Sequence, residues 1–374
     1  MRAKQPRVRF GMRTLGIAAA TVAAAVSAAV PATGPADSTS TNGAPTVGVV
    51  EYNLGDDAFT DRRWLHGFGE MRAVVHYPEK LTRDKGTAKL PVVVLQHGNQ
   101  VPCYSLDAAD RTWPCPRGVE PYPSNRGLDY LGEALATSGF VVVSPSANGI
   151  NNFMGAASQN ARMIAAHLRL LQQLSTTGGG PLSGAFTDPD TGLPKAVDFT
   201  GVLDLSRVGV LGHSTAGEAA MYLASEDNRH ELPAGVSIKG ALSLASPAPS
   251  GFFSTLVTDE PIAVVSSGCW SRGNEMYFQQ ARAYGGKRGF LLRVRKANHN
   301  FYNTEWTVGP GPTDGDDSGC PAAKGRPTAE DQRQLAVTYA RAFFRYALYD
   351  DYSGLPILTG DEPAGDVETD VETY

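Results

Sequence analysis

The sequence predicts an α/β fold with a mainly parallel central sheet and helices on both of its faces. Short runs of apolar, β-branched residues recur along the chain, helical patterns alternate with them, and 42% of the 374 residues are hydrophobic. Such continuous apolar runs are typical of strands that are buried on both faces of a parallel sheet. Strands that alternate with helices imply right-handed βαβ units.

Residues 1–36 are expected to be an export signal rather than a part of this fold. Five basic residues lie between positions 2 and 13, and an Ala-rich apolar run covers residues 15–30. This arrangement is typical of a signal peptide, and the run is shorter than the ~20 apolar residues that cross a bilayer. We therefore predict secretion and no membrane span in the mature chain, with an uncleaved anchor as the alternative. Residues 37–47 are small and polar, which predicts a linker.

The charge of the chain bears on its partners. Removal of residues 1–36 takes away five positive charges and no negative ones, so the formal net charge moves from −5 to −10. Because sequence-independent binding of nucleic acid needs a basic surface, a nucleic-acid partner is not expected. The length suits one catalytic domain over residues 48–358. Residues 359–374 are acidic and poor in apolar residues, which predicts a frayed tail.

The expected elements of this domain follow in order. After antiparallel edge strands within 48–77, apolar runs predict strands at 90–96, 140–144, 208–211, 241–245, 262–266 and 290–294. Helical patterns cover 128–137, 158–174, 215–224 and 329–348. The segment 176–204 is rich in Gly, Pro and Asp, which predicts a long surface loop. No large insertion lies between 245 and 262, so we expect an open site without a large lid.

The strongest chemical signal is the segment VGVLGHSTAGEAA at residues 208–220. A short apolar strand leads into the turn, and a helix of small residues follows. This is the context of a G-x-S-x-G nucleophile elbow, whose tight turn needs small flanking residues. Gly212 meets this need, and Ala216 replaces the usual second glycine. We therefore predict that Ser214 is a catalytic nucleophile; the alternative is a non-catalytic protein that keeps the turn for packing.

The elbow resembles that of the α/β-hydrolase superfamily. It is most similar to secreted bacterial esterases related to platelet-activating-factor acetylhydrolases, chlorophyllases and cutinase-like polyester hydrolases, and the likeness covers roughly residues 48–360. The matching segments are VVVLQHGNQ (92–100), GLDYLGEALATSGFVVVSPSANGIN (127–151), ANHNFYNTEW (297–306) and AFFRYAL (342–348). The resemblance implies an α/β-hydrolase fold and a lipase-like serine esterase that needs no cofactor and no metal.

An oxyanion hole needs two backbone N–H groups that point at the developing negative charge. One is expected from Thr215, the residue after the nucleophile. By resemblance, the other comes from Asn99, in the loop that follows the strand at 90–96. His97, in the same loop, is expected to hold the loop through hydrogen bonds rather than to take part in the chemistry.

The general base is expected late in the chain, because the triad order in this fold is Ser, acid, His. His299 is the only histidine after His230, and it follows the strand at 290–294 by a short loop. Its position and its neighbours match those of the family's catalytic histidine. His213 is expected to pack beside the site.

The triad acid is less clearly indicated. Related esterases often carry Asp directly after a cysteine in the loop that follows the strand at 262–266, and Trp270 stands at that place here. Glu275 is our first candidate, because its longer side chain reaches from a few residues further on. A chain without a competent acid would be slow or inactive, since loss of the acid lowers kcat by about 10⁴. The remaining alternatives are Glu218, Asp259 and Glu260.

Four cysteines in an exported chain indicate disulfides. Of the three possible pairings we favour Cys103–Cys115, which closes one loop, together with Cys269–Cys320, which ties the acid loop to the His299 loop. A zinc site is not expected, because neither a CxxC motif nor clustered histidines are present.

Taken together, the motifs predict a secreted serine hydrolase that cleaves small or polymeric carboxylic esters through an acyl-enzyme. Trp270 motivates one alternative, a catalytically impaired binding protein on the same fold. Acyl transfer and peptide hydrolysis are further alternatives within enzymes. Neither a protein partner nor an oligomeric state is indicated.

Overall fold

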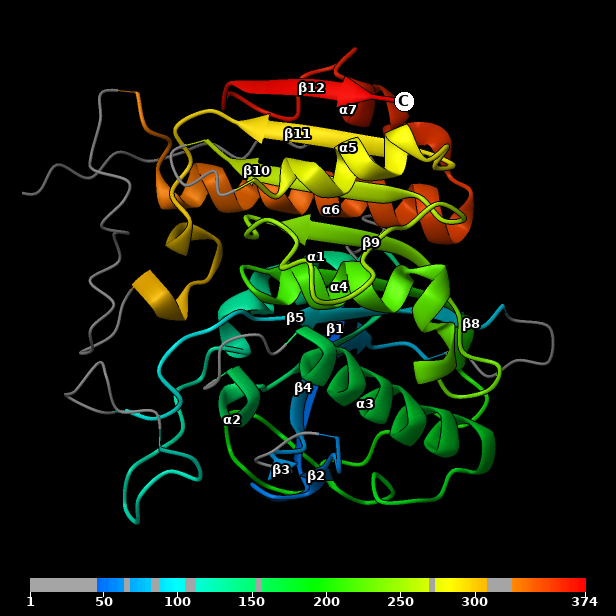
Figure 1. Ribbon diagram of the computed structural model, residues 1–374. Helices are drawn as coiled ribbons and strands as arrows, with labels where there is room; N and C mark the ends of the chain where they lie inside the picture. The colour runs from blue at the N-terminus through cyan, green and yellow to red at the C-terminus, as the bar shows by residue number, and fades with distance from the viewer. Residues whose placement is uncertain are drawn as a thin grey trace, which may run out of the picture. The chain divides into compact units, whose positions relative to one another are not determined.

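The computed structural model of the chain describes residues 46–63, 68–81, 88–104, 112–151, 157–268, 273–307 and 325–374. These residues form an α/β unit around a ten-stranded, mostly parallel sheet with the order β12-β11-β10-β9-β8-β5-β6-β4-β1-β7 (Figure 1). The predicted α/β class is therefore confirmed. The expected signal at 1–36 lies outside the described residues, as does the linker at 37–47 apart from its last two residues.

The central strands are parallel to one another. Most of their residues are buried on both faces, which explains why the sequence shows them as continuous apolar runs. They lie close to the predicted ranges, except that β8 begins five residues before Val208. The strands are β5 (Leu90–Gln96), β6 (Val141–Pro145), β8 (Leu203–His213), β9 (Ile238–Leu244), β10 (Ile262–Ser267) and β11 (Gly289–Val294).

Both edges of the sheet are antiparallel. At one edge β4 pairs with β6 and β1 with β4, as expected for the segment 48–77. The short strand β7, which pairs with β1, lies within the segment 176–204, for which only a surface loop was predicted. At the other edge β12 pairs with β11 (Figure 1). A separate small sheet joins β2 and β3. These strands are β1 (Val47–Asn53), β2 (Phe59–Thr60), β3 (Phe68–Gly69), β4 (Arg72–Pro78), β7 (Phe186–Thr187) and β12 (Thr369–Thr373).

The prediction of a frayed C-terminal tail is wrong for β12. The Arg295 guanidinium donates to both carboxylate oxygens of Asp370, each at 2.9 Å. Arg293 donates to Glu372 at 3.0 Å. Opposite charges on paired strands stabilise a sheet, so the acidic residues of the tail match Arg293 of β11 and Arg295, the residue just after β11. The Tyr374 ring completes the contact by packing 5.0 Å from the ring of Phe278.

Helices cover both faces of the sheet (Figure 1). Helices α1 and α6 pack together on one face, and α3, α4 and α5 lie on the other. The predicted helices are therefore present, and residues 245–261 contain no helix, in agreement with the expectation for this segment. The helices are α1 (Asp129–Ala136), α2 (Asn148–Asn151), α3 (Ala157–Thr177), α4 (Ala216–Ala224), α5 (Glu275–Ala283), α6 (Ala329–Tyr349) and α7 (Leu355–Thr359).

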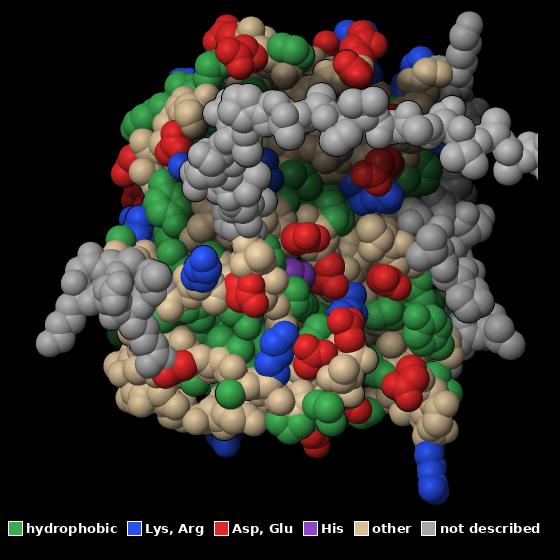
Figure 2. All heavy atoms as spheres, turned by 180° about the vertical axis from the view of Figure 1, so that it is seen from behind, with side chains coloured by type: hydrophobic (Ala, Val, Ile, Leu, Met, Phe, Trp, Pro, Cys, Tyr) green, Lys and Arg blue, Asp and Glu red, His purple; other side chains and the backbone are tan. Residues whose placement is uncertain are grey.

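The surface carries both signs of charge. On the face shown in Figure 2, the acidic side chains lie among the basic ones, and the basic side chains drawn there form no continuous patch. None of the described helices combines the length and the apolar character that a bilayer crossing requires.

Candidate active site

Ser214 lies in the turn between β8 and α4. Its φ angle is +57°, in the left-handed region that non-glycine residues rarely adopt. Two backbone hydrogen bonds hold this turn: the Ser214 N–H donates to the Leu244 oxygen, and the Gly217 N–H donates to the Ser214 oxygen, both at 2.9 Å. A strained turn from strand to helix is the backbone geometry that an elbow serine needs.

The small residues of the turn are required by close approach. A Cβ atom on Gly212 would lie 2.0 Å from the Ala216 oxygen, at the start of α4. A Cβ atom on Gly217 would lie 2.5 Å from the Cβ of Ser246, just beyond the end of β9. Neither separation is possible between real atoms, so both positions exclude any side chain. The packing role of Gly217 was not apparent from the sequence.

The loop after β5 lies directly against Ser214. A Cβ atom on Gly98 would lie 2.4 Å from the Ser214 Cβ and 2.7 Å from the His213 oxygen. The next residue, Asn99, donates its N–H to the Thr215 hydroxyl at 3.1 Å. The two residues predicted for the oxyanion hole, Asn99 and Thr215, therefore come together beside the side chain of Ser214.

His97 fixes this loop from the protein interior. Its Nδ1–H donates to the Gly98 oxygen at 2.8 Å, and its Nε2 accepts from the Ala147 N–H at 2.9 Å. Both bonds require a neutral ring that carries its proton on Nδ1. Burial lowers the pKa of His97 to about 4, which keeps the ring neutral. The predicted holding role of His97 is confirmed.

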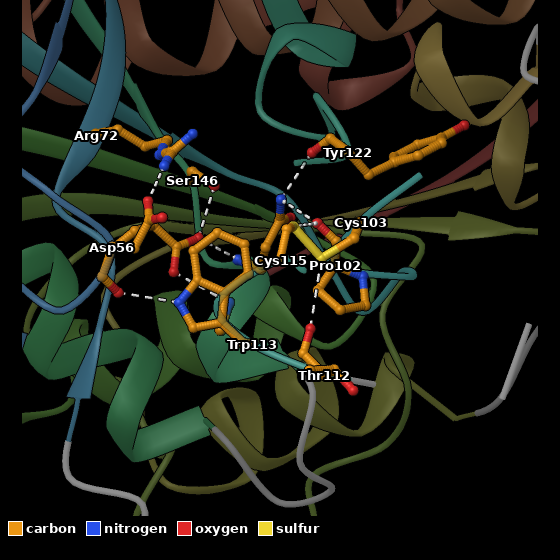
Figure 3. Close-up of a disulfide and its surroundings, with 12 residues drawn as sticks. Asp56, Arg72, Pro102, Cys103, Thr112, Trp113, Cys115, Tyr122 and Ser146 are labelled. Atoms are coloured by element: carbon orange, nitrogen blue, oxygen red, sulfur yellow. Dashed lines mark hydrogen bonds and ion pairs between the residues drawn. A yellow bond between two sulfur atoms is a disulfide. The ribbon is translucent and has the colours of Figure 1, made fainter. Parts of the chain in front are cut away.

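A disulfide joins Cys103 to Cys115 further along this loop, which confirms the predicted pair (Figure 3). Beneath it, the Asn148 side chain donates to the backbone oxygens of Pro102 at 3.0 Å and Tyr122 at 2.7 Å. The loop is thus bound to α2 by side-chain bonds as well as by the disulfide. The second predicted pair, Cys269–Cys320, lies outside the described residues, as does Trp270.

The buried carboxylate of Glu70 holds the start of α2, to which this loop is bound. Glu70 accepts from the Ser146 hydroxyl at 2.7 Å and from the Gly149 N–H at 3.0 Å. Burial raises the pKa of Glu70, while these bonds and the nearby Arg72 act in the opposite direction. Trp113, whose indole N–H donates to the Asp56 oxygen at 3.0 Å, lies beside the disulfide (Figure 3). A Cβ atom on Gly149 would lie 2.5 Å from the Trp113 ring and 2.9 Å from a Glu70 carboxylate oxygen, so the ring and the carboxylate meet at the Gly149 backbone.

His299 reaches the elbow through His213. The His213 Nε2–H donates to the His299 backbone oxygen at 3.0 Å, and the two rings lie 4.9 Å apart. Trp306 packs against both rings: it stacks on His299 with the centroids 5.9 Å apart, and it lies tilted against His213 at 4.7 Å. His213 precedes the predicted nucleophile, so the structure brings the predicted base into the same neighbourhood as Ser214. Both Ser214 and His299 are buried.

The loop that carries His299 is clamped by Gln332 of α6. The Gln332 side chain accepts from the Asn298 N–H at 2.9 Å and donates to the Asn298 oxygen at 2.6 Å. Sequence reasoning missed this residue. Its only signal is a polar side chain in helical register with the buried Leu335, Ala336 and Tyr339.

The carboxylates considered for the triad form their hydrogen bonds elsewhere. Glu275 accepts from Arg293 at 3.0 Å, and Glu218 accepts from the Ser250 N–H at 2.8 Å. In the part of the chain that the structure describes, neither of these two carboxylates is hydrogen-bonded to His299. Asp259 accepts from Arg229 at 2.6 Å, and Glu260 accepts from Lys239 at 2.8 Å.

An amide side chain, that of Asn300, lies beside the His299 ring. Nδ1 of His299 lies 2.8 Å from Oδ1 of Asn300. Because an amide oxygen only accepts, this contact places the ring proton on Nδ1. Sequence reasoning also missed Asn300, although it belongs to the Asn-His-Asn segment on which the resemblance was based.

A scan against protein-family models finds no match for this chain, and a search of curated proteins finds none either. The likeness to secreted bacterial esterases therefore depends on the motifs of the chain itself.

Proposed function

We propose that this chain is a serine-dependent hydrolase of carboxylic esters with an α/β-hydrolase fold. The observation that carries the proposal is the left-handed backbone of Ser214, with the Gly98 backbone packed against its side chain. A serine in such a turn presents its hydroxyl beside the amides of two loops, which is the arrangement that acyl transfer needs.

In the proposed reaction, the Ser214 hydroxyl attacks the ester carbonyl while His299 accepts the hydroxyl proton through Nε2. The carbonyl oxygen becomes an oxyanion, which the N–H groups of Thr215 and Asn99 stabilise. The tetrahedral species collapses, and His299 returns the proton to the departing alcohol. A water molecule then attacks the acyl-enzyme by the same steps, releasing the acid and restoring Ser214.

The contribution of the oxyanion hole to the proposed reaction can be estimated. Removal of one such donor lowers kcat by about 10²–10³ in enzymes of this type. The loop that carries the Asn99 N–H is held by His97 and by the bonds of Asn148. The Asn99 N–H donates to the Thr215 hydroxyl in this structure, and in the proposed reaction the oxyanion replaces that hydroxyl as its acceptor. Because the rest of the loop is fixed, little other reorganisation is needed, which supports a catalytic use of this loop.

Secretion is part of the proposal. The disulfide between Cys103 and Cys115 supports it, because such bonds form and persist in oxidising compartments.

Ester turnover tests the function. The purified protein is assayed with p-nitrophenyl acetate and butyrate, and Ser214→Ala and His299→Ala are compared with wild type. Both variants are expected to lose at least about 10³-fold in kcat/KM. The matched controls Ser353→Ala and His230→Ala change exposed residues of the same types outside the proposed site, and they are expected to keep the wild-type rate. A Ser214→Ala variant that hydrolyses these esters as fast as wild type would contradict the proposal.

A further inference from the structure

A cavity of about 460 Å³ lies between α3 and the segment that contains β2, in the lower part of Figure 1. Its lining comes mainly from residues 54–63 and 162–170, and neither Ser214 nor His299 is among the described residues that line it. We propose that this space, the α3 cavity, binds a small amphiphilic monocarboxylate, in which one carboxylate is joined to an apolar body. The inference adds a second ligand site and does not depend on the proposed ester hydrolysis.

The apolar side chains of the α3 cavity suit the body of such a ligand. Ala166 and Leu170 are four residues apart on α3, so they lie on one face of the helix. Phe59 and Met71 contribute buried side chains from outside this helix. Small-molecule sites are typically cavities of about 300–1,000 Å³ with mostly apolar walls and a few polar groups. The α3 cavity has this size and this character.

Both carboxylates that line the α3 cavity are paired with arginines. Glu231 accepts two hydrogen bonds from the Arg63 guanidinium, at 2.8 and 2.9 Å. Asp61 is bound by the Arg162 guanidinium and also by Arg63, whose Nε lies 3.4 Å from Oδ1. The side chains of Asp61 and Glu231 are each only 7% exposed, so the pairs are a fixed part of the wall. Among the described lining residues, no acid is therefore left to attract a cationic ligand.

Arg169 supplies a positive charge that these pairs do not neutralise. It lies two turns after Arg162 on the same face of α3, and it lines the cavity. In the parts of the chain that the structure describes, no group forms an ion pair or a hydrogen bond with its guanidinium. Three arginines thus face two carboxylates, which gives the lining a formal charge of +1. Because arginine binds a carboxylate through two parallel N–H···O bonds, one carboxylate from a ligand completes the set.

The same features select against other classes of ligand. A cation is repelled by the net positive charge, and a neutral molecule leaves the Arg169 guanidinium without a partner. A phosphate ester carries about −1.5 to −2 charges at pH 7, which exceeds the single positive charge of the lining. A monocarboxylate with an apolar body matches the charge and the apolar walls together.

Isothermal titration calorimetry of octanoate into the full chain at pH 7 tests the inference. Wild type is expected to bind with a Kd of about 1 mM or below, in line with ten non-hydrogen atoms of ligand. Arg169→Gln keeps a polar side chain but removes the charge, so its Kd is expected to rise about tenfold. Added salt is expected to weaken binding to wild type and to have little effect on Arg169→Gln. The matched control Arg341→Gln changes an exposed arginine of α6 and is expected to keep the wild-type Kd.

A second variant and two related ligands test the apolar part and the charge separately. Ala166→Phe places a ring in the cavity and is expected to raise the Kd for octanoate by at least about tenfold. The ligands 1-octanol and octyltrimethylammonium share the chain but lack the carboxylate, and they are expected to bind about tenfold more weakly than octanoate. Thermal unfolding identifies any variant whose loss of binding comes from misfolding.

The outcomes separate this inference from the proposed function. No binding of octanoate at about 10 mM would overturn it, as would an equal Kd for wild type and Arg169→Gln or for octanoate and 1-octanol. If a fluorophosphonate label on Ser214 abolishes binding while Arg169→Gln preserves it, the ligand occupies the proposed active site, which also overturns the inference. A Ser214→Ala variant with wild-type turnover contradicts the proposed function alone, since binding in the α3 cavity needs no nucleophile.

Discussion

Gly98→Ala tests whether the loop after β5 lies against the nucleophile. The added methyl group would be placed 2.4 Å from the Ser214 Cβ and 2.7 Å from the His213 oxygen, whereas ordinary contacts of a Cβ begin at 3.4 Å. The loop and the elbow must therefore separate by ~1 Å, since both neighbours are buried and fixed by backbone bonds. Displacement of catalytic groups by about 1 Å lowers rates by about 10²-fold.

The expected result is a kcat/KM for p-nitrophenyl acetate that is about 10²-fold below wild type. Stability is expected to fall by about 1–3 kcal/mol, as in other overpacked interiors. The assay is steady-state hydrolysis together with urea unfolding, so that the loss of rate is measured on folded protein. The fall in rate should lie mainly in kcat, because the methyl group displaces the oxyanion donors rather than a remote binding surface.

Gly179→Ala is the matched control. Its added Cβ would meet only the Thr177 hydroxyl, at 3.3 Å, on the surface. We expect wild-type kinetics from it. A Gly98→Ala variant that keeps the wild-type rate would refute the reasoning, because the loop could then not lie against Ser214 as described.

Three further predictions concern the surroundings of the site. Gln332→Leu removes both hydrogen bonds to Asn298, so the free energy of unfolding in urea should fall by about 2 kcal/mol, and kcat should fall as well. An unchanged kcat would show that these two bonds do not contribute to catalysis. Burial lowers the pKa of His167 to about 3, so its ring stays neutral in the folded protein between pH 7 and 5, whereas the ring in the unfolded chain gains a proton. This histidine therefore lowers the free energy of unfolding by about 2 kcal/mol at pH 5. His167→Gln keeps an acceptor for the Tyr52 hydroxyl and should reduce the difference in unfolding free energy between pH 7 and 5 by that amount; an equal pH dependence would contradict the assigned cause. Deletion of residues 361–374 should lower stability by at least ~2 kcal/mol by removing β12 and its charge pairs, whereas a frayed tail would be lost without effect.

Much of the fold was predictable, because buried parallel strands have a direct signature in sequence. β5, β6, β9, β10 and β11 are mostly buried on both faces, so apolar residues run along them with little polar alternation. β12 was missed for the opposite reason, since its residues are acidic and are stabilised by arginines of a distant strand. Composition within a short window cannot reveal a partner that lies some 75 residues away.

The elbow was predictable from a local pattern, and the structure gives Ser214 the backbone geometry that the pattern implies. The acid was not predictable by counting residues after β10. Glu275 is the first residue of α5, and its carboxylate bonds to Arg293 of β11. Asn300 was overlooked because an amide is not an acid. Gln332 was overlooked because its contact with Asn298 joins segments 34 residues apart.

The central claim is that Ser214 is a nucleophile, and covalent labelling tests it most directly. A fluorophosphonate probe transfers its phosphonyl group to an activated serine oxygen, with loss of fluoride and of the hydroxyl proton. Peptide mapping by mass spectrometry is expected to find the added mass on the peptide that contains Ser214, and none on Ser214→Ala. A label on another serine, or an unlabelled wild-type protein that is folded, would contradict the account.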